Sequence, residues 1–258
     1  MSWEKEEKSP GWTRREWVKL AMTAGAVGTI AATGGLVTGQ LLPPPIQFPG
    51  EIREALTYTK FPTPQWWNSK HGRPMRVSDF EEWQGATGVW RGVFQDDQWV
   101  PGTGFPVLAI RVKREDAHFV TPDPTSFAPL PEGFNLYYDD GEATRIIVVF
   151  DRCVHLCCSP GWHVVTNPPP PRDYGTYGAT PPTWTVFEQD PIYCICHASQ
   201  YDPLLLVTDL NPSPVNVNYP GARMVHGPAT RALPLIPVKA EAGTLIGGMA
   251  DPRWYVYC

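Results

Sequence analysis

Proline occurs 30 times among the 258 residues of this chain and is spread along most of its length. Because proline lacks a backbone N–H and breaks helix interiors, this distribution argues against a helical bundle. A sheet protein with long, rigid loops accommodates so many prolines better. Apolar residues make up 42% of the chain, which is enough for a sizeable core in one or two domains. We therefore expect an all-β fold.

Several apolar runs predict individual strands. A β-branched run fills 144–150, and other apolar runs cover 105–114 and 203–209. The segment 88–100 predicts a hairpin that turns at Asp96 and Asp97. The final residues, 253–258, predict a strand that closes a sheet. No long amphipathic helix is expected after residue 42.

The N-terminal region predicts a membrane location. Arg14 and Arg15 stand before an aromatic residue, an apolar residue and Lys19, a pattern that is similar to a twin-arginine export signal. The uncharged segment 20–42 is long enough to cross a bilayer, and no small-x-small cleavage site follows it. We expect an uncleaved single-pass anchor at 20–42, with residues 1–19 in the cytoplasm. A proline-rich linker, 43–50, would connect it to a head domain, 51–258, on the outer side of the cell membrane.

Five of the six cysteines lie in two short segments, which we call box 1 (153–158, CVHLCC) and box 2 (194–202, CICHASQYD). Two thiolates and two imidazoles suit zinc or an iron–sulfur cluster with mixed ligation; the candidates are Cys153, His155, Cys194 and His197. A structural zinc site would explain these four residues. It would explain neither Cys158 and Cys196, which could form a disulfide in an oxidising compartment, nor the export signal. Twin-arginine export carries proteins that are already folded, often with their cofactors inserted, and this favours an iron–sulfur cluster over zinc.

Both boxes resemble the cluster-binding boxes of Rieske iron–sulfur proteins of the cytochrome bc type. The usual form of those boxes is Cys-Thr-His-Leu-Gly-Cys and Cys-Pro-Cys-His-Gly-Ser-x-Tyr-Asp. The resemblance implies an antiparallel β-sandwich with a small cluster-binding subdomain at about 151–203, in addition to the N-terminal transmembrane helix.

The resemblance also implies roles for individual residues. Cys153 and Cys194 would bind one iron of a [2Fe–2S] cluster, and His155 and His197 would bind the other. Imidazole ligation would raise the reduction potential into the range of about −150 to +300 mV. The remaining implied roles are a disulfide between Cys158 and Cys196, hydrogen bonds to the cluster from Ser199 and Tyr201, and a covering proline loop at 227–230.

The function that the resemblance implies is quinol oxidation within a cytochrome bc-type respiratory complex. His155 and His197 would act at the exposed tip, where an imidazole accepts a proton from quinol while the cluster takes an electron. The expected partners are a cytochrome b-type subunit, quinol, and a c-type cytochrome or another electron acceptor. A net charge of −5 without a basic patch gives no indication of nucleic-acid binding.

The boxes depart from the family pattern at Val154, Ile195, Ala198 and Cys157, and the separation of Cys153 from Cys194 is longer than usual at 194 − 153 = 41 residues. The insert at about 159–191 contains His163, which we expect to be a loop histidine rather than a ligand. Cys157 competes with Cys158 for Cys196, and the register with the family favours Cys158. The sequence leaves two roles for Cys258, a free thiol or an incidental core residue.

Three alternatives remain at this point. The small Rieske subunit of a molybdenum oxidase such as arsenite oxidase can also carry a twin-arginine signal. An aromatic-ring oxygenase or its ferredoxin normally lacks the disulfide pair, so Cys158 and Cys196 argue against it. A zinc-stapled extracytoplasmic domain would need only the four metal-ligand candidates.

Overall fold

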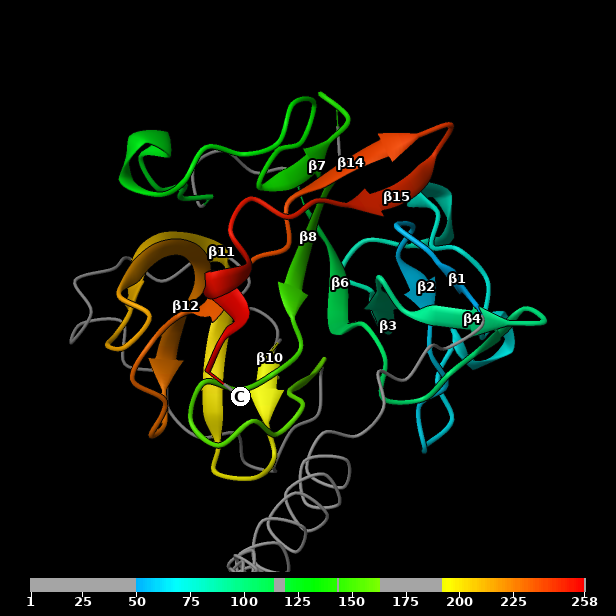
Figure 1. Ribbon diagram of the computed structural model, residues 1–258, viewed down its shortest axis with the longest axis horizontal. Coiled ribbons are helices and arrows are strands. Elements are labelled where there is room, and N and C mark those ends of the chain that lie inside the picture. The colour runs from blue at the N-terminus through cyan, green and yellow to red at the C-terminus, as the bar shows by residue number, and fades with distance from the viewer. Residues whose placement is uncertain (1–49, 114–118, 143, 163–191, 258) are drawn as a thin grey trace, which may run out of the picture. The chain divides into compact units, whose positions relative to one another are not determined.

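Two five-stranded antiparallel sheets form most of the computed structural model, which describes residues 50–113, 119–142, 144–162 and 192–257 (Figure 1). The first sheet has the order β2-β3-β6-β8-β7, with bounds Thr57–Tyr58, Gly85–Trp90, Phe105–Lys113, Thr144–Phe150 and Tyr137–Asp139. The second has the order β13-β12-β11-β10-β9, with bounds Leu233–Pro234, Val217–His226, Ser199–Asn211, Ile192–Cys194 and Gly161–Trp162.

Two smaller sheets complete the strands. One has the order β1-β4-β5, with bounds Glu51–Ile52, Val93–Gln95 and Gln98–Trp99. The other pairs β14 (Val238–Glu241) with β15 (Thr244–Gly247). The described residues contain no α-helix, and their short 3₁₀ helices are Asn68–Lys70, Val77–Asp79, Pro124–Ser126 and Pro252–Tyr255. The prediction of an all-β fold is confirmed.

The centre of the first sheet is the pair β6 and β8. All seven residues of β8 are buried, as expected for a continuous β-branched run with neighbours on both sides. Val107 of β6 lies opposite Phe150, the last residue of β8. The strands predicted at 105–114 and 144–150 are confirmed, and 203–209 lies within β11. Box 1 begins just after β8, so the most buried strand fixes where it starts.

The predicted hairpin at 88–100 is also confirmed, because β4 pairs with β5 around Asp96 and Asp97. Both aspartates have positive φ, 47° and 60°. Aspartate tolerates this left-handed region better than most residues, and two such residues make the turn that suits the twist of a tight hairpin.

The strand predicted at 253–258 is wrong. Residues Pro252–Tyr255 form a 3₁₀ helix, which starts where the Asp251 carboxylate accepts a hydrogen bond from the Arg253 backbone N–H at 2.9 Å. An aspartate cap followed by proline favours a helical turn, and this local signal outweighs the aromatic alternation that suggested a strand.

The predicted membrane location is corrected as well. In the part of the chain that the structure describes, no helix is long and apolar enough to cross a membrane. The segment 20–42, on which that prediction rested, lies outside the described residues.

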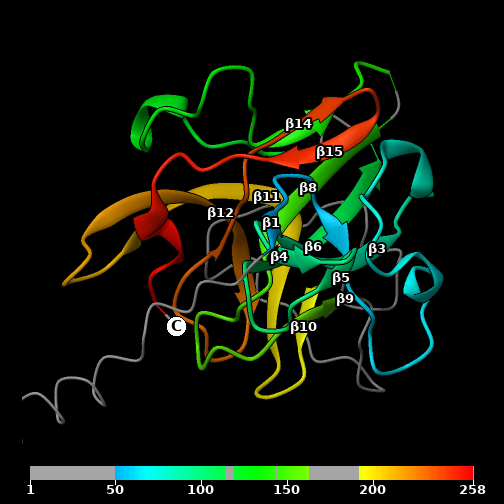
Figure 2. The same cartoon turned by 45° about the vertical axis from the view of Figure 1, so that its right-hand side comes forward.

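The second sheet is attached to β8 next to box 1. The Ile236 backbone N–H donates to the Val148 carbonyl at 2.8 Å, and Val149 forms an isolated bridge with Leu235. Figure 2 shows β10 and β11 of this sheet continuing past the first sheet to a hairpin end. That hairpin end is the turn of box 2, so each box extends from a strand anchored in the core.

An ion pair in the loop region before β3 gives a test of pH-dependent stability. Burial alone would raise the pKa of Asp79, but hydrogen bonds from Lys70 (2.5 Å), the Arg76 backbone and Tyr58 (3.0 Å) outweigh it and lower the pKa below 3.8. A lowered folded-state pKa stabilises the protein above the unfolded pKa, and this stability is lost as the pH falls through the folded value.

We therefore expect Asp79→Asn to lower the free energy of unfolding by about 1 kcal/mol at pH 7 and by less near pH 3. Urea unfolding at both pH values measures the difference. A deficit that stays constant with pH would contradict the ion-pair explanation.

Candidate metal centre

The two boxes fold into turns of the same kind. In box 1 the Cys157 N–H donates to the Cys153 carbonyl at 2.9 Å, and in box 2 the Ala198 N–H donates to the Cys194 carbonyl at 2.9 Å. Each turn therefore begins at a cysteine and closes four residues later. Cys153 follows β8, while Cys194 is the last residue of β10 and lies opposite Ser199, the first residue of β11.

The fifth residue of each turn has a left-handed backbone. Cys157 and Ala198 both have φ of +61°, a region that side chains with a Cβ enter at a cost of about 1–2 kcal/mol. These are the two positions where the Rieske pattern has glycine. The residues that depart from the pattern keep the backbone conformation that glycine would adopt freely.

The thiols of Cys153 and Cys194 lie side by side in the interior. Both residues are 1% exposed and neither forms a disulfide among the described residues. A hydrogen bond from Cys194 lowers the pKa of the Cys153 thiol to about 5, with further help from Tyr201 and Ser199. The same pairing raises the pKa of Cys194. A buried pair of sulfurs that stabilises negative charge on one member is suited to hold a cation.

The two imidazoles meet at the outer end of the turns. The ring centroids of His155 and His197 are 4.7 Å apart, with the ring planes at 88°. His155 is half-buried and His197 is exposed. The Nδ1 atom of His155 is buried and has no hydrogen-bond partner among the described residues. A buried nitrogen without a partner is costly unless something binds it, so this atom is available to a metal.

A disulfide joins the two turns, from Cys158 to Cys196, with Cα atoms 6.6 Å apart. The sulfurs of Cys158, Cys194 and Cys196 lie within 4.8 Å of one another, which is close enough for a shared metal ion. However, two of these three sulfurs are bonded to each other, so they are not free to act as thiolates. The oxidised site offers one thiol and one imidazole from each turn.

Two polar side chains reach the thiols from β11. The Tyr201 hydroxyl lies 3.1 Å from the Cys153 sulfur, and both groups are buried. The Ser199 hydroxyl is fully buried and accepts a hydrogen bond from the Ala229 N–H at 3.2 Å. The predicted site residues therefore form two groups: Cys153, Cys194, Ser199 and Tyr201 in the interior, and His155 with His197 nearer the surface.

The segment 227–230 packs directly on box 2. A Cβ at Gly227 would lie 2.6 Å from the Cα of Ser199 and 2.7 Å from the carbonyl oxygen of Ala198, and the φ of Gly227 is +93°. Only glycine allows this approach, because the atoms that a Cβ would meet belong to the backbone.

Gly227→Ala is therefore expected to lower the free energy of unfolding by about 2–4 kcal/mol, from backbone strain plus steric overlap. Gly102→Ala is the matched control, since Gly102 also has positive φ (+83°) but nothing lies within 4 Å of its added Cβ. The control should cost only about 1 kcal/mol. Equal losses in guanidinium unfolding would show that the approach to box 2 is unimportant.

Sequence reasoning missed the buried carboxyl that precedes box 1. Asp151 is 4% exposed, and its Oδ1 has no hydrogen-bond partner among the described residues. Burial raises the pKa of Asp151 to about 8, against the opposing charge of Arg152. The only feature of the sequence that points to the burial of Asp151 is its position directly after a strand predicted to be buried.

Sequence reasoning also missed two apolar side chains at the tips of the turns. Leu156 is 61% exposed and directly follows His155, and Ile195 is 66% exposed and precedes His197 by two residues. His163 and most of the insert lie outside the described residues.

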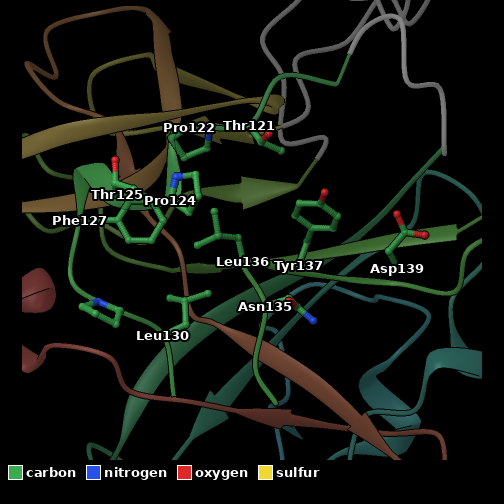
Figure 3. A pocket seen from close by; sticks show the side chains of 11 residues that line it. Thr121, Pro122, Pro124, Thr125, Phe127, Leu130, Asn135, Leu136, Tyr137 and Asp139 are labelled. Atoms are coloured by element: carbon green, nitrogen blue, oxygen red, sulfur yellow. The ribbon is translucent and has the colours of Figure 1, made fainter. Parts of the chain in front are cut away.

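A large hollow of about 950 Å³ lies elsewhere, between the segment 121–130 and β7 (Figure 3). Figure 3 shows Phe127, Leu130, Leu136 and Tyr137 around it. Asp139, its only carboxylate, already pairs with Arg145 at 3.0 Å. None of the residues that line it belongs to either box, so we assign the chemistry to the turns.

No protein-family model matches the chain, and no curated protein matches it.

Proposed function

We propose that the chain is a Rieske-type protein that binds a [2Fe–2S] cluster, with Cys153 and Cys194 on one iron and His155 and His197 on the other. One observation carries the proposal: two turns of the same kind each supply one buried free thiol and one imidazole, and a disulfide holds the turns together. The antiparallel β-sandwich with a cluster-binding subdomain at about 151–203 is part of this proposal.

The residues present fit such a cluster. The thiols are buried while the imidazoles lie nearer the surface, which suits two metal ions at different depths. The Nδ1 atom of His155, which has no hydrogen-bond partner among the described residues, can bind a metal ion. The Tyr201 hydroxyl adds a hydrogen bond to a ligand sulfur. When bound, a cluster of this type takes up and releases one electron.

The proposed activity is oxidation of quinol within a cytochrome bc-type complex, followed by electron transfer to a c-type cytochrome or a similar acceptor. The exposed His197 and half-buried His155 would accept a hydrogen bond and a proton from the quinol hydroxyl. Leu156 and Ile195 would contact the apolar part of the quinol or a cytochrome b-type subunit, because both are exposed and lie in the same two turns as the histidines.

The test is metal and acid-labile sulfide analysis of the purified chain, with electron paramagnetic resonance of the dithionite-reduced protein. Two iron and two sulfide per chain with a mixed-ligand [2Fe–2S] signal are expected. Reduction by a quinol analogue, followed by stopped-flow absorption, tests the substrate. Zinc without a reduced-cluster signal would overturn the proposal in favour of a structural zinc site.

Tyr201→Phe is expected to lower the midpoint potential by about 50 mV while the cluster stays bound. The hydroxyl stabilises the more negative reduced state through Cys153, and about 1 kcal/mol of differential hydrogen bonding corresponds to a shift of this size. Protein-film voltammetry measures it. The control is Tyr193→Phe, from β10, and an unchanged potential in Tyr201→Phe would contradict the assignment.

A further inference from the structure

The vicinal cysteine of box 1 is not a spare thiol. The structure has Cys157 in a disulfide, separate from the bond between Cys158 and Cys196. Cys153 and Cys194 are free thiols. Of the six cysteines in the sequence, these assignments leave only Cys258 as a partner for Cys157 within the chain.

The residue before Cys258 lies at Cys157. The Cys157 sulfur is 3.8 Å from the carbonyl oxygen of Tyr257, and since a disulfide sulfur has no proton this is a contact rather than a hydrogen bond. The Tyr257 hydroxyl donates to the Arg152 carbonyl at 2.7 Å, and its ring packs against Phe150 with centroids 5.8 Å apart. Tyr257 is therefore held against Arg152 and Cys157, at the start of box 1.

We propose that Cys157 and Cys258 form a second disulfide, which ties the carboxyl terminus to box 1. This bond removes Cys157 as a competitor for Cys196, so the turn-to-turn bridge forms only from Cys158. It also holds Cys157 in its left-handed backbone conformation between Cys153 and Cys158. All six cysteines then have one assignment each, with two thiols left for a metal centre.

Formation of this bond is an oxidation that needs an electron acceptor. Two S–H bonds break, one S–S bond forms, and two protons and two electrons leave the thiols. The co-reactant we name is a disulfide-bearing oxidant, either a thiol–disulfide exchange protein or a low-molecular-weight disulfide, which is reduced to its dithiol form. Exchange proceeds through a mixed disulfide at Cys157 or Cys258.

Tryptic mapping without reduction tests the pairing on the full chain. Free thiols are blocked with N-ethylmaleimide during unfolding, and cleavage after lysine and arginine gives the peptides 153–172, 173–223 and 254–258. We expect 254–258 (WYVYC) to appear in one species with the other two and to be released only by reduction. The result does not depend on any bound cluster, so it is independent of the proposed function.

Two single variants separate the bonds. In Cys158→Ser, 254–258 should stay joined to 153–172 while 173–223 is released. In Cys157→Ser, peptide 254–258 should appear on its own without reduction, with its cysteine modified by N-ethylmaleimide. Recovery of peptide 254–258 with N-ethylmaleimide on Cys258, in the unmodified chain, would overturn the proposal. So would release of 254–258 from 153–172 in Cys158→Ser, or an intact mass that corresponds to a disulfide-linked dimer.

A melting experiment adds a second readout. The double variant Cys157→Ser/Cys258→Ser should melt roughly 4–12 °C below the unmodified chain, because a closed loop is removed from the unfolded state. An unchanged melting temperature would contradict a stabilising disulfide between Cys157 and Cys258.

Discussion

With the proposed cluster ligation, Cys194→Ser is expected to reduce the iron content of the purified chain from the proposed two per molecule to near zero. The serine hydroxyl is not ionised at neutral pH and is a poor ligand for iron, whereas the thiolate is the preferred one. Cys194 is 1% exposed at the end of β10, and the neighbouring Cys196 sulfur is bonded to Cys158. No other thiol of box 2 is therefore free to replace it.

The matched control is Cys157→Ser, which makes the same change in box 1 at a cysteine that is not a candidate ligand. It should retain the cluster signal, although its stability falls. Iron and sulfide analysis with electron paramagnetic resonance compares the two variants. A full cluster in Cys194→Ser would remove Cys194 from the ligand set and would undermine the Rieske proposal itself.

The strands were predictable where the local pattern and the tertiary environment agree. The run of Ile146, Ile147, Val148 and Val149 is too apolar for any place except the middle of a sheet, and β8 lies there. The chain end was not predictable from aromatic alternation, because Asp251 caps a 3₁₀ helix whose Trp254 is fully buried. The hydrogen bond to the Asp251 carboxylate favours a helical backbone at 252–255 over an extended one.

The candidate site divides in the same way. The donor types in boxes 1 and 2 are visible in the sequence, and so is their resemblance to a known pattern. Neither residue type at positions 157 and 198 indicates the left-handed backbone of Cys157 and Ala198, and only the glycines at the matching positions of the resembled pattern point to it. The burial of Asp151 is not visible in the sequence, and neither is the hydrogen bond that its N–H donates to the carbonyl of the distant Pro106 at 2.9 Å. The positive φ values belong to local turns, whereas the environment of Asp151 is built by a segment far away in the chain.

Removal of the bridge between the turns, by Cys158→Ser/Cys196→Ser, is expected to lower the free energy of unfolding by about 3 kcal/mol. The bridge closes a loop with a sequence separation of 38, and a cross-link of this span stabilises mainly by restricting the unfolded chain. The melting temperature should fall by about 6–12 °C for a domain of this size. Both cysteines are changed together because a single substitution would leave a reactive thiol beside the centre.

The same variant distinguishes a bridge that only stabilises the fold from one that also protects the metal centre. His155 and His197 meet at the surface ends of the turns, and the bridge is the covalent link between those turns. Without it the turns can separate, so we expect a bound cluster to be lost faster on dilution into chelator, in addition to the lower stability. Cluster loss is followed by visible absorption at a temperature well below melting. If the loss rate matches that of the unmodified chain while the melting temperature falls, the bridge acts on the fold alone, and the turns hold the centre through their backbone hydrogen bonds.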